Sequence, residues 1–225
     1  MEDTSILRVE GISKSFPGIK ALDNVSFSLK KGEIHAIVGE NGAGKSTLMH
    51  IIGGVLKPDS GKIFLEDKQV HFNSVHDAIR SGISLVFQEL SLVGSLSVAE
   101  NIFANRQPVG ILNKIQWSKL YKLTAEFLHK FNLDLDPKTL VKNLSMGEQQ
   151  ILEILKAISI NPKVLILDEP TSSLTEGEIA YLFENIKKLQ KQGMSFIYIT
   201  HKLSEVFRIA DRVTVLRDGK KIATK

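Results

Sequence analysis

Residues 39–46, Gly-Glu-Asn-Gly-Ala-Gly-Lys-Ser, match the pattern G-x-x-x-x-G-K-[ST] and decide the fold. An apolar run, Ile34 to Val38, precedes them. The residues that follow carry an apolar stripe with the spacing of one helical face, namely Leu48, Ile51, Ile52 and Val55. Glycines let a backbone curl so that several N–H groups point at one anion, and the positive end of a following helix adds to this attraction. The segment therefore predicts a strand, a phosphate-binding loop and a helix in succession.

The charged and hydroxyl side chains of this loop suit the phosphates of a nucleotide and their metal ion. Lys45 is a flexible point charge that can reach the terminal phosphates, and the Ser46 hydroxyl can bind Mg²⁺. The alternative is a glycine-rich turn with a solvated lysine, which the flanking strand and helix disfavour. The residues expected to contact ATP are Gly39, Glu40, Asn41, Gly42, Ala43, Gly44, Lys45, Ser46 and Thr47.

Two later apolar runs indicate a parallel sheet covered by helices. Val164–Leu167 and Phe196–Ile199 are apolar without alternation, which is typical of strands buried on both faces. An amphipathic helix is predicted between them from the spacing of Ile179, Leu182, Phe183, Ile186 and Leu189. A strand, a helix and a strand in this order imply a right-handed crossover.

The remaining patterns complete the expected fold. The first 30 residues alternate as strands do, and residues 213–223 predict a hairpin with a turn at Asp218-Gly219. Residues 89 to about 160 carry helical patterns and no convincing strand. The expected fold class is therefore α/β, a P-loop NTPase core with an antiparallel β subdomain and a helical subdomain inserted at about 89–160.

Composition narrows the class of protein. The chain has 225 residues, of which 43% are hydrophobic and 24% charged, and it contains no cysteine, so disulfides and thiolate metal sites are excluded. The start, Met1 to Ser5, is polar and acidic and predicts no signal peptide. No stretch approaches the roughly 18 apolar residues of a membrane-spanning helix. The net charge is +4, but the lysines are spread along the chain without interleaved aromatic residues, so no nucleic-acid partner is expected.

Two adjacent carboxylates follow the predicted strand Val164–Leu167. The carboxyl end of a parallel strand is where α/β sheets bind ligands, so Asp168 is suited to hold Mg²⁺ opposite Ser46. Glu169 is then the candidate general base for an attacking water. Two acids after a strand otherwise form a helix cap or a solvated loop, an interpretation that the phosphate loop disfavours.

Two more polar residues follow predicted strands. His201 comes directly after Phe196–Thr200 and is expected to contact the γ-phosphate and to hold the water and Glu169 in line. Gln88 ends the run Ile83–Phe87 and is expected to sense Mg²⁺ or water and to hinge the helical subdomain. A structural histidine and a surface amide are the alternatives for these two residues.

The segment Leu-Ser-Met-Gly-Glu, residues 144–148, predicts the start of a helix. Ser145 and Glu148 have the spacing of a capping box, in which each side chain binds the backbone N–H of the other residue. A capped helix start is also a site for anions. Ser145 acting only as a cap is the alternative interpretation.

Together these motifs resemble the nucleotide-binding domains of ABC transporters, and the resemblance covers nearly the whole chain. It implies that Ser145 and Gly147 contact the γ-phosphate of ATP held by an opposing domain, so that two domains pair head to tail around two nucleotides. It also implies that Phe16 stacks on adenine, although an aromatic residue near a strand end is more often part of a core. The sequence departs from the family's pattern at Met146, Glu148 and Thr175, and Thr175 with Glu178 forms another capping-box pattern.

A finer resemblance is to the ATP-binding subunits of monosaccharide importers of the ribose, galactose and xylose kind. The strings that carry it are Ser15–Gly18, Phe87–Leu90, Ser97–Ile102, Ser172–Thr175 and Ile199–Val206. In that family two such domains share one chain and the matches favour the first, so we expect a fragment of a tandem polypeptide.

The resemblance also implies the setting in which the chain works. The expected partners are a second ATP-binding domain, transmembrane permease subunits that dock around Glu89–Asn101 and, indirectly, a solute-binding protein, at the cytoplasmic face of the membrane. The alternatives are an ABC ATPase for another cargo, a soluble ABC ATPase outside transport, and a fragment that binds ATP without hydrolysing it.

Overall fold

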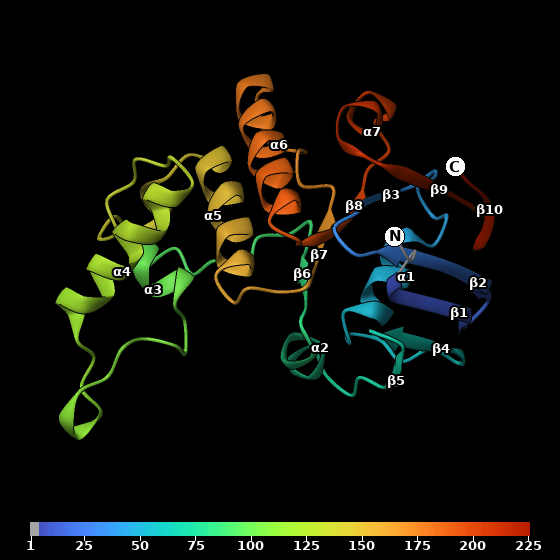
Figure 1. Ribbon diagram of the computed structural model, residues 1–225, viewed down its shortest axis with the longest axis horizontal. Coiled ribbons are helices and arrows are strands. Elements are labelled where there is room, and N and C mark those ends of the chain that lie inside the picture. The colour runs from blue at the N-terminus through green and yellow to red at the C-terminus, as the bar shows by residue number, and fades with distance from the viewer. Residues whose placement is uncertain (1–4) are drawn as a thin grey trace. The chain divides into compact units, whose positions relative to one another are not determined.

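The computed structural model describes residues 5–225, apart from the side chain of Leu112. The polar start from Met1 to Thr4, on which the expectation about a signal peptide rests, lies outside the described residues. The chain divides into two compact units (Figure 1). The first comprises Met1–Gln88, Pro162–Pro170 and Ile186–Lys225, and the second comprises Glu89–Asn161 and Thr171–Asn185.

A six-stranded sheet forms the centre of the first unit, with the strand order β10-β9-β3-β8-β7-β6. All pairs are parallel except the terminal β9–β10 hairpin. Every residue of β3, β7 and β8 is buried, which confirms the strands predicted from unbroken apolar runs. The bounds are β3 (Ile34–Val38), β6 (Ile83–Val86), β7 (Val164–Asp168), β8 (Ser195–Ile199), β9 (Arg212–Arg217) and β10 (Lys220–Thr224).

A second sheet in this unit is antiparallel, with the order β2-β1-β4-β5. The alternation of the first 30 residues predicted the strands β1 (Ser5–Phe16) and β2 (Ile19–Lys30). The strands β4 (Ser60–Leu65) and β5 (Lys68–Val70) and the helix α2 (Val75–Ser81) were not predicted. In β4 only two of six residues are buried, so the apolar alternation is too short to stand out.

The helix after the phosphate loop is shorter than predicted. α1 runs over Lys45–Ile52, and the Gly53-Gly54 pair ends it, with Gly54 in the left-handed region. Val55 was expected on the buried face of this helix, but it lies beyond the helix and is exposed. The last helix of the unit is α7 (Leu203–Ile209).

The second unit is helical. It contains α3 (Val98–Ile102), α4 (Trp117–Lys130), α5 (Met146–Ile158), the short 3₁₀ helices η1 (Ile111–Asn113) and η2 (Val141–Asn143), and the first part of α6 (Glu176–Lys191). Its described residues form two isolated β-bridges but no named strand. Across the described part of the chain, no helix combines the length and the apolar character needed to cross a membrane.

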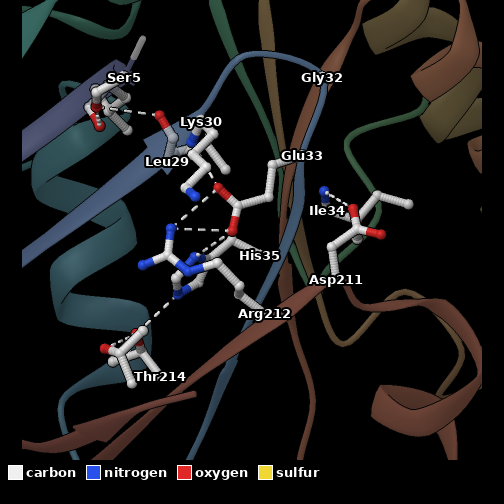
Figure 2. Close-up of polar contacts among 12 residues, drawn as sticks. Ser5, Leu29, Lys30, Gly32, Glu33, Ile34, His35, Asp211, Arg212 and Thr214 are labelled. Carbon is white, nitrogen blue, oxygen red and sulfur yellow. Dashed lines mark hydrogen bonds and ion pairs between the residues drawn. The ribbon is translucent and has the colours of Figure 1, made fainter. Parts of the chain in front are cut away.

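A buried polar cluster links β3 to β9 within the six-stranded sheet (Figure 2). His35 lies between the Glu33 carboxylate, 3.2 Å from its Nδ1, and the Thr214 hydroxyl, 2.7 Å from its Nε2. Arg212 approaches the same carboxylate, and the Lys30 amide donates to it. Burial raises the pKa of Glu33, but the hydrogen bonds from His35 and Lys30 and the charges nearby outweigh it and hold the pKa below its ordinary value.

Candidate nucleotide-binding site

The phosphate loop joins β3 to α1 as predicted, and its glycines are required for different reasons. A Cβ on Gly39 would collide with the backbone carbonyl of Leu216, so this position needs space. Gly44 has a φ of +96° and packs against the carbonyl of Ala21, so it needs both space and a left-handed backbone. Gly42 is also left-handed, with a φ of +84°, but its surroundings are open. The loop therefore holds the start of α1 at a fixed place beside two carbonyl groups of the first unit.

Lys45 is the first residue of α1 and is buried. Its ammonium donates hydrogen bonds to the backbone carbonyls of Gly39, at 2.8 Å, and Glu40, at 3.0 Å. The positive charge is therefore held across the loop by acceptors that phosphate oxygens can replace.

A cavity of 490 Å³ opens over the loop, a size typical of sites for small ligands. It gathers Phe16 from the end of β1, Gln88 from the end of β6 and Glu169 and His201 from the ends of β7 and β8. Its full lining is Phe16, Ile19, Ala21, Asn41, Gly42, Gly44, Lys45, Ser46, Thr47, Gln88, Glu169 and His201. Of the loop residues expected to contact ATP, Gly39, Glu40 and Ala43 are absent from this lining.

Two residues of the cavity, Ile19 and Ala21, were not predicted from the sequence. Ile19 is 63% exposed beside Phe16, which is 39% exposed. Two large apolar side chains left in water next to a phosphate loop suit the flat face of a base. The available signal was the position of Ile19 directly after the Pro17-Gly18 turn, three residues from Phe16.

Asp168 ends β7 and lies behind the loop. Its carboxylate is buried and accepts a hydrogen bond from the Ser46 side chain. Burial raises the pKa of Asp168, and the neighbouring charge of Glu169 raises it further, against the lowering effect of the Ser46 hydrogen bond. A carboxylate in such a position gains from a nearby cation.

Glu169 and His201 face each other across the ends of two paired strands. The Nδ1 atom of His201 lies 3.1 Å from the Oε1 atom of Glu169. The Glu169 backbone has a φ of +47°, and its amide donates to the carbonyl of Ile199 at 3.1 Å. A left-handed backbone is uncommon for a residue other than glycine, asparagine or aspartate, and such strained positions cluster at functional sites.

The predicted capping box of α5 is present in the second unit. The Ser145 amide donates to the Glu148 carboxylate at 2.7 Å, and the Glu148 amide donates to the Ser145 hydroxyl at 3.2 Å. Ser145 and Met146 are exposed, whereas Gly147 is buried. The second predicted capping box, of Thr175 with Glu178, is present too.

Comparison with known proteins places this geometry in a family. Residues 22–172, about two thirds of the chain, match the ABC transporter family. The chain belongs to this family. The cassette is 50% identical over 214 residues to a ribose import ATP-binding protein of Caldanaerobacter subterraneus and 51% identical over 223 residues to a xylose import ATP-binding protein of Thermoanaerobacter pseudethanolicus.

These matches cover 95% and 97% of the cassette but only 43% and 44% of the two relatives. The chain therefore spans less than half the length of the curated relatives that it matches.

Solved structures agree with this assignment. The cassette superimposes with a TM-score of 0.85 on a nucleotide-free ATP-binding cassette from an ABC transporter, at 30% identity and with 98% and 90% of the two chains covered. It superimposes with a TM-score of 0.84 on a dimeric cassette in a post-hydrolysis state bound to ADP and Pi, at 25% identity and with 97% of each chain covered. The fold is that of an ABC ATPase cassette.

Proposed function

We propose that the cassette binds Mg·ATP over its phosphate loop and hydrolyses it to energise an ABC importer of a monosaccharide. The observation that carries this proposal is the single cavity in which Lys45, Ser46, Glu169 and His201 meet. Identity of about one half to import ATP-binding proteins for ribose and xylose supports the sugar as cargo.

The triphosphate lies along the start of α1. Phosphate oxygens accept from the amides of the loop and from Lys45, which exchanges its carbonyl partners for them. The exposed ring of Phe16 and the exposed methyl groups of Ile19 pack against the adenine base.

The residues behind the loop fit Mg²⁺. This ion keeps several waters and takes one or two protein oxygens together with phosphate oxygens, so it needs no dense cluster of ligands. Such a cluster of three or more His, Cys, Asp or Glu side chains is absent from the described residues. Ser46 and Asp168 would supply the hydroxyl and carboxylate, and Gln88, which lines the same cavity as Ser46, would contact the ion or one of its waters. A bound ion would neutralise charge that develops on the phosphates.

Hydrolysis uses the two residues at the strand ends. Glu169 accepts a proton from the water as its oxygen attacks the γ-phosphorus, and the bond to the leaving oxygen of ADP breaks. His201 donates a hydrogen bond to the γ-phosphate and keeps the Glu169 carboxylate in place. Its position 3.1 Å from Glu169 supports this positioning role.

A complete site needs two cassettes. We place Ser145 and Gly147 against the γ-phosphate of ATP bound to an opposing cassette, supplied by a second copy or by the other half of a tandem chain. The dimeric relative with ADP and Pi supports pairing. The short span of the chain within its relatives supports a tandem origin. The compact unit of Glu89–Asn161 and Thr171–Asn185 supports a helical subdomain inserted at about 89–160.

Membrane permease subunits dock on the second unit at the cytoplasmic face of the membrane. Only part of the proposed docking segment, Glu89–Asn101, is available to a partner. Four of its residues are buried, namely Ser97, Val98, Ala99 and Asn101. The exposed side chains of Val93 and Leu96 are its apolar part.

The proposal is tested by the rate of ATP hydrolysis per chain over a wide range of protein concentration. A composite site predicts a rate that rises with concentration, because bringing two copies together is bimolecular. A constant rate per chain on dilution would contradict it. The cargo is then tested by uptake of ribose, xylose and galactose in a strain that lacks the genes for the cassette and its proposed permease, compared with the same strain after those genes are restored.

A further inference from the structure

Gly147 is buried although the residue before it, Met146, is 58% exposed. The group that covers it belongs to the same chain. A Cβ added to Gly147 would overlap all three terminal atoms of the Glu178 carboxylate. The start of α5 is therefore in van der Waals contact with the start of α6, within the second unit.

The Glu178 carboxylate is held in this position. Its Oε2 accepts from the Thr175 amide and the Thr175 hydroxyl, both at 2.8 Å. The Glu178 amide in turn lies 3.4 Å from the Thr175 hydroxyl. A free glutamate side chain would swing away from an alanine at position 147 at little cost, but this one must first give up its bonds to Thr175.

The two capping boxes are therefore joined at one contact. Glu148 fixes the Ser145 end of α5, and Glu178 fixes the Thr175 end of α6 and rests on Gly147, between Ser145 and Glu148. A displacement of either helix start must move the other or break a capping box.

We infer that Glu178 is a positioning residue, which locks the segment at 171–175 to the start of α5 and thereby sets the place of Ser145 and Gly147. This inference rests on the proposed function of those two residues. It also assigns Gly147 a requirement within its own chain, apart from any contact with nucleotide.

A double-mutant cycle on thermal unfolding tests the packing without reference to activity. Gly147→Ala should lower Tm by several degrees, because the methyl group displaces Glu178 and breaks the α6 cap. In a Glu178→Ala background, Gly147→Ala should lower Tm much less, because the carboxylate that obstructs the added methyl group is gone. Gly177→Ala is the matched control: its Cβ would meet nothing within 4 Å, so it should leave Tm unchanged or raise it slightly. Equal costs of Gly147→Ala in both backgrounds would overturn the inference.

The positioning role is tested by a second measurement, one that a loss of stability alone would not change. At a temperature where all variants are folded, Glu178→Ala should raise severalfold the protein concentration that gives half-maximal ATPase rate per chain. Its affinity for ATP when dilute should stay within twofold of wild type. Glu178→Gln keeps the capping box and should restore wild-type behaviour. Wild-type concentration dependence in Glu178→Ala would refute the role, whereas an inactive wild-type chain would refute the proposed function and leave the thermal test intact.

Discussion

His201 and Glu169 lie 3.1 Å apart, Nδ1 to Oε1, although 32 positions separate them in the chain. The pairing of β7 with β8 sets this distance, because Asp168 lies opposite Ile199 in the parallel register and each functional residue follows within two positions. The Glu169 side chain is only 17% exposed, whereas that of His201 is 55% exposed. A mostly buried carboxylate beside an exposed imidazole suits a general base that the imidazole holds in position for the attacking water.

Replacement of Glu169 by glutamine should reduce turnover by about 10²–10⁴, because general-base assistance contributes about that factor. Glutamine preserves the size of the side chain and its approach to His201, so ATP affinity should stay near that of the wild type. Single-turnover hydrolysis and equilibrium binding of ATP measure the two quantities. His76→Ala, at an exposed histidine of α2, is a control for nonspecific effects. Near-normal hydrolysis by the glutamine variant would remove Glu169 from this role.

Asp168→Asn should stabilise the nucleotide-free cassette at neutral pH. The pKa of Asp168 is raised in the folded state by burial and by Glu169, so the folded chain binds this proton more tightly than the unfolded chain. The stability that the folded chain gains from this tighter proton binding is fully present below the pKa of the unfolded state. It is lost as pH rises through the raised pKa of the folded state. Tm of the variant should therefore exceed that of wild type by a few degrees at pH 7, and the gap should close in acid. The same variant should lose the Mg²⁺ dependence of ATP affinity, and a lower Tm at pH 7 would contradict the argument.

Lys45→Ala should weaken ATP binding by about 10- to 150-fold, the equivalent of one hydrogen-bonded charge at roughly 1.5–3 kcal/mol. The Lys45 ammonium is buried and lies between the carbonyls of Gly39 and Glu40. Lys45→Arg should therefore also bind ATP more weakly than wild type, because the planar guanidinium cannot fit between these two carbonyls. Titration with a fluorescent ATP analogue gives the affinities. Lys57→Ala, at an exposed lysine of the same unit, should bind as wild type does.

Features encoded over a few neighbouring residues could be predicted from the sequence. The loop pattern predicted β3 and the start of α1, although not its end. The i, i+3 spacing of Ser145 with Glu148 and of Thr175 with Glu178 predicted two capping boxes that the structure contains. The unbroken apolar runs predicted β7 and β8 because burial on both faces removes the polar half of the pattern.

Features that depend on distant partners could not be predicted. β4 and β5 are mostly exposed, so the pairing of β4 with β1 and of β5 with β4, rather than their own sequence, makes them strands. The left-handed backbone of Glu169 follows from the amide contact with Ile199 on the next strand. The burial of Gly147 depends on the rotamer of Glu178, 31 positions further along, for which no sequence pattern exists.

Glu33→Gln should destabilise the cassette at neutral pH by about 1.5–3 kcal/mol, because hydrogen bonds to a charged group contribute in that range and the change leaves His35 and Arg212 with a neutral partner. The pKa of Glu33 is lowered in the folded state, so its contribution is present above the unfolded pKa and is lost as pH falls through the lower folded pKa. Urea unfolding at several pH values should therefore show the largest difference from wild type near pH 7 and a shrinking difference in acid. Glu66→Gln is the matched control, since its pKa is also lowered, mainly by Lys163, but the pair is about half exposed and surface pairs contribute little. A difference for Glu33→Gln that is independent of pH would mean that the shape of the side chain, and not its charge, holds β3 to β9.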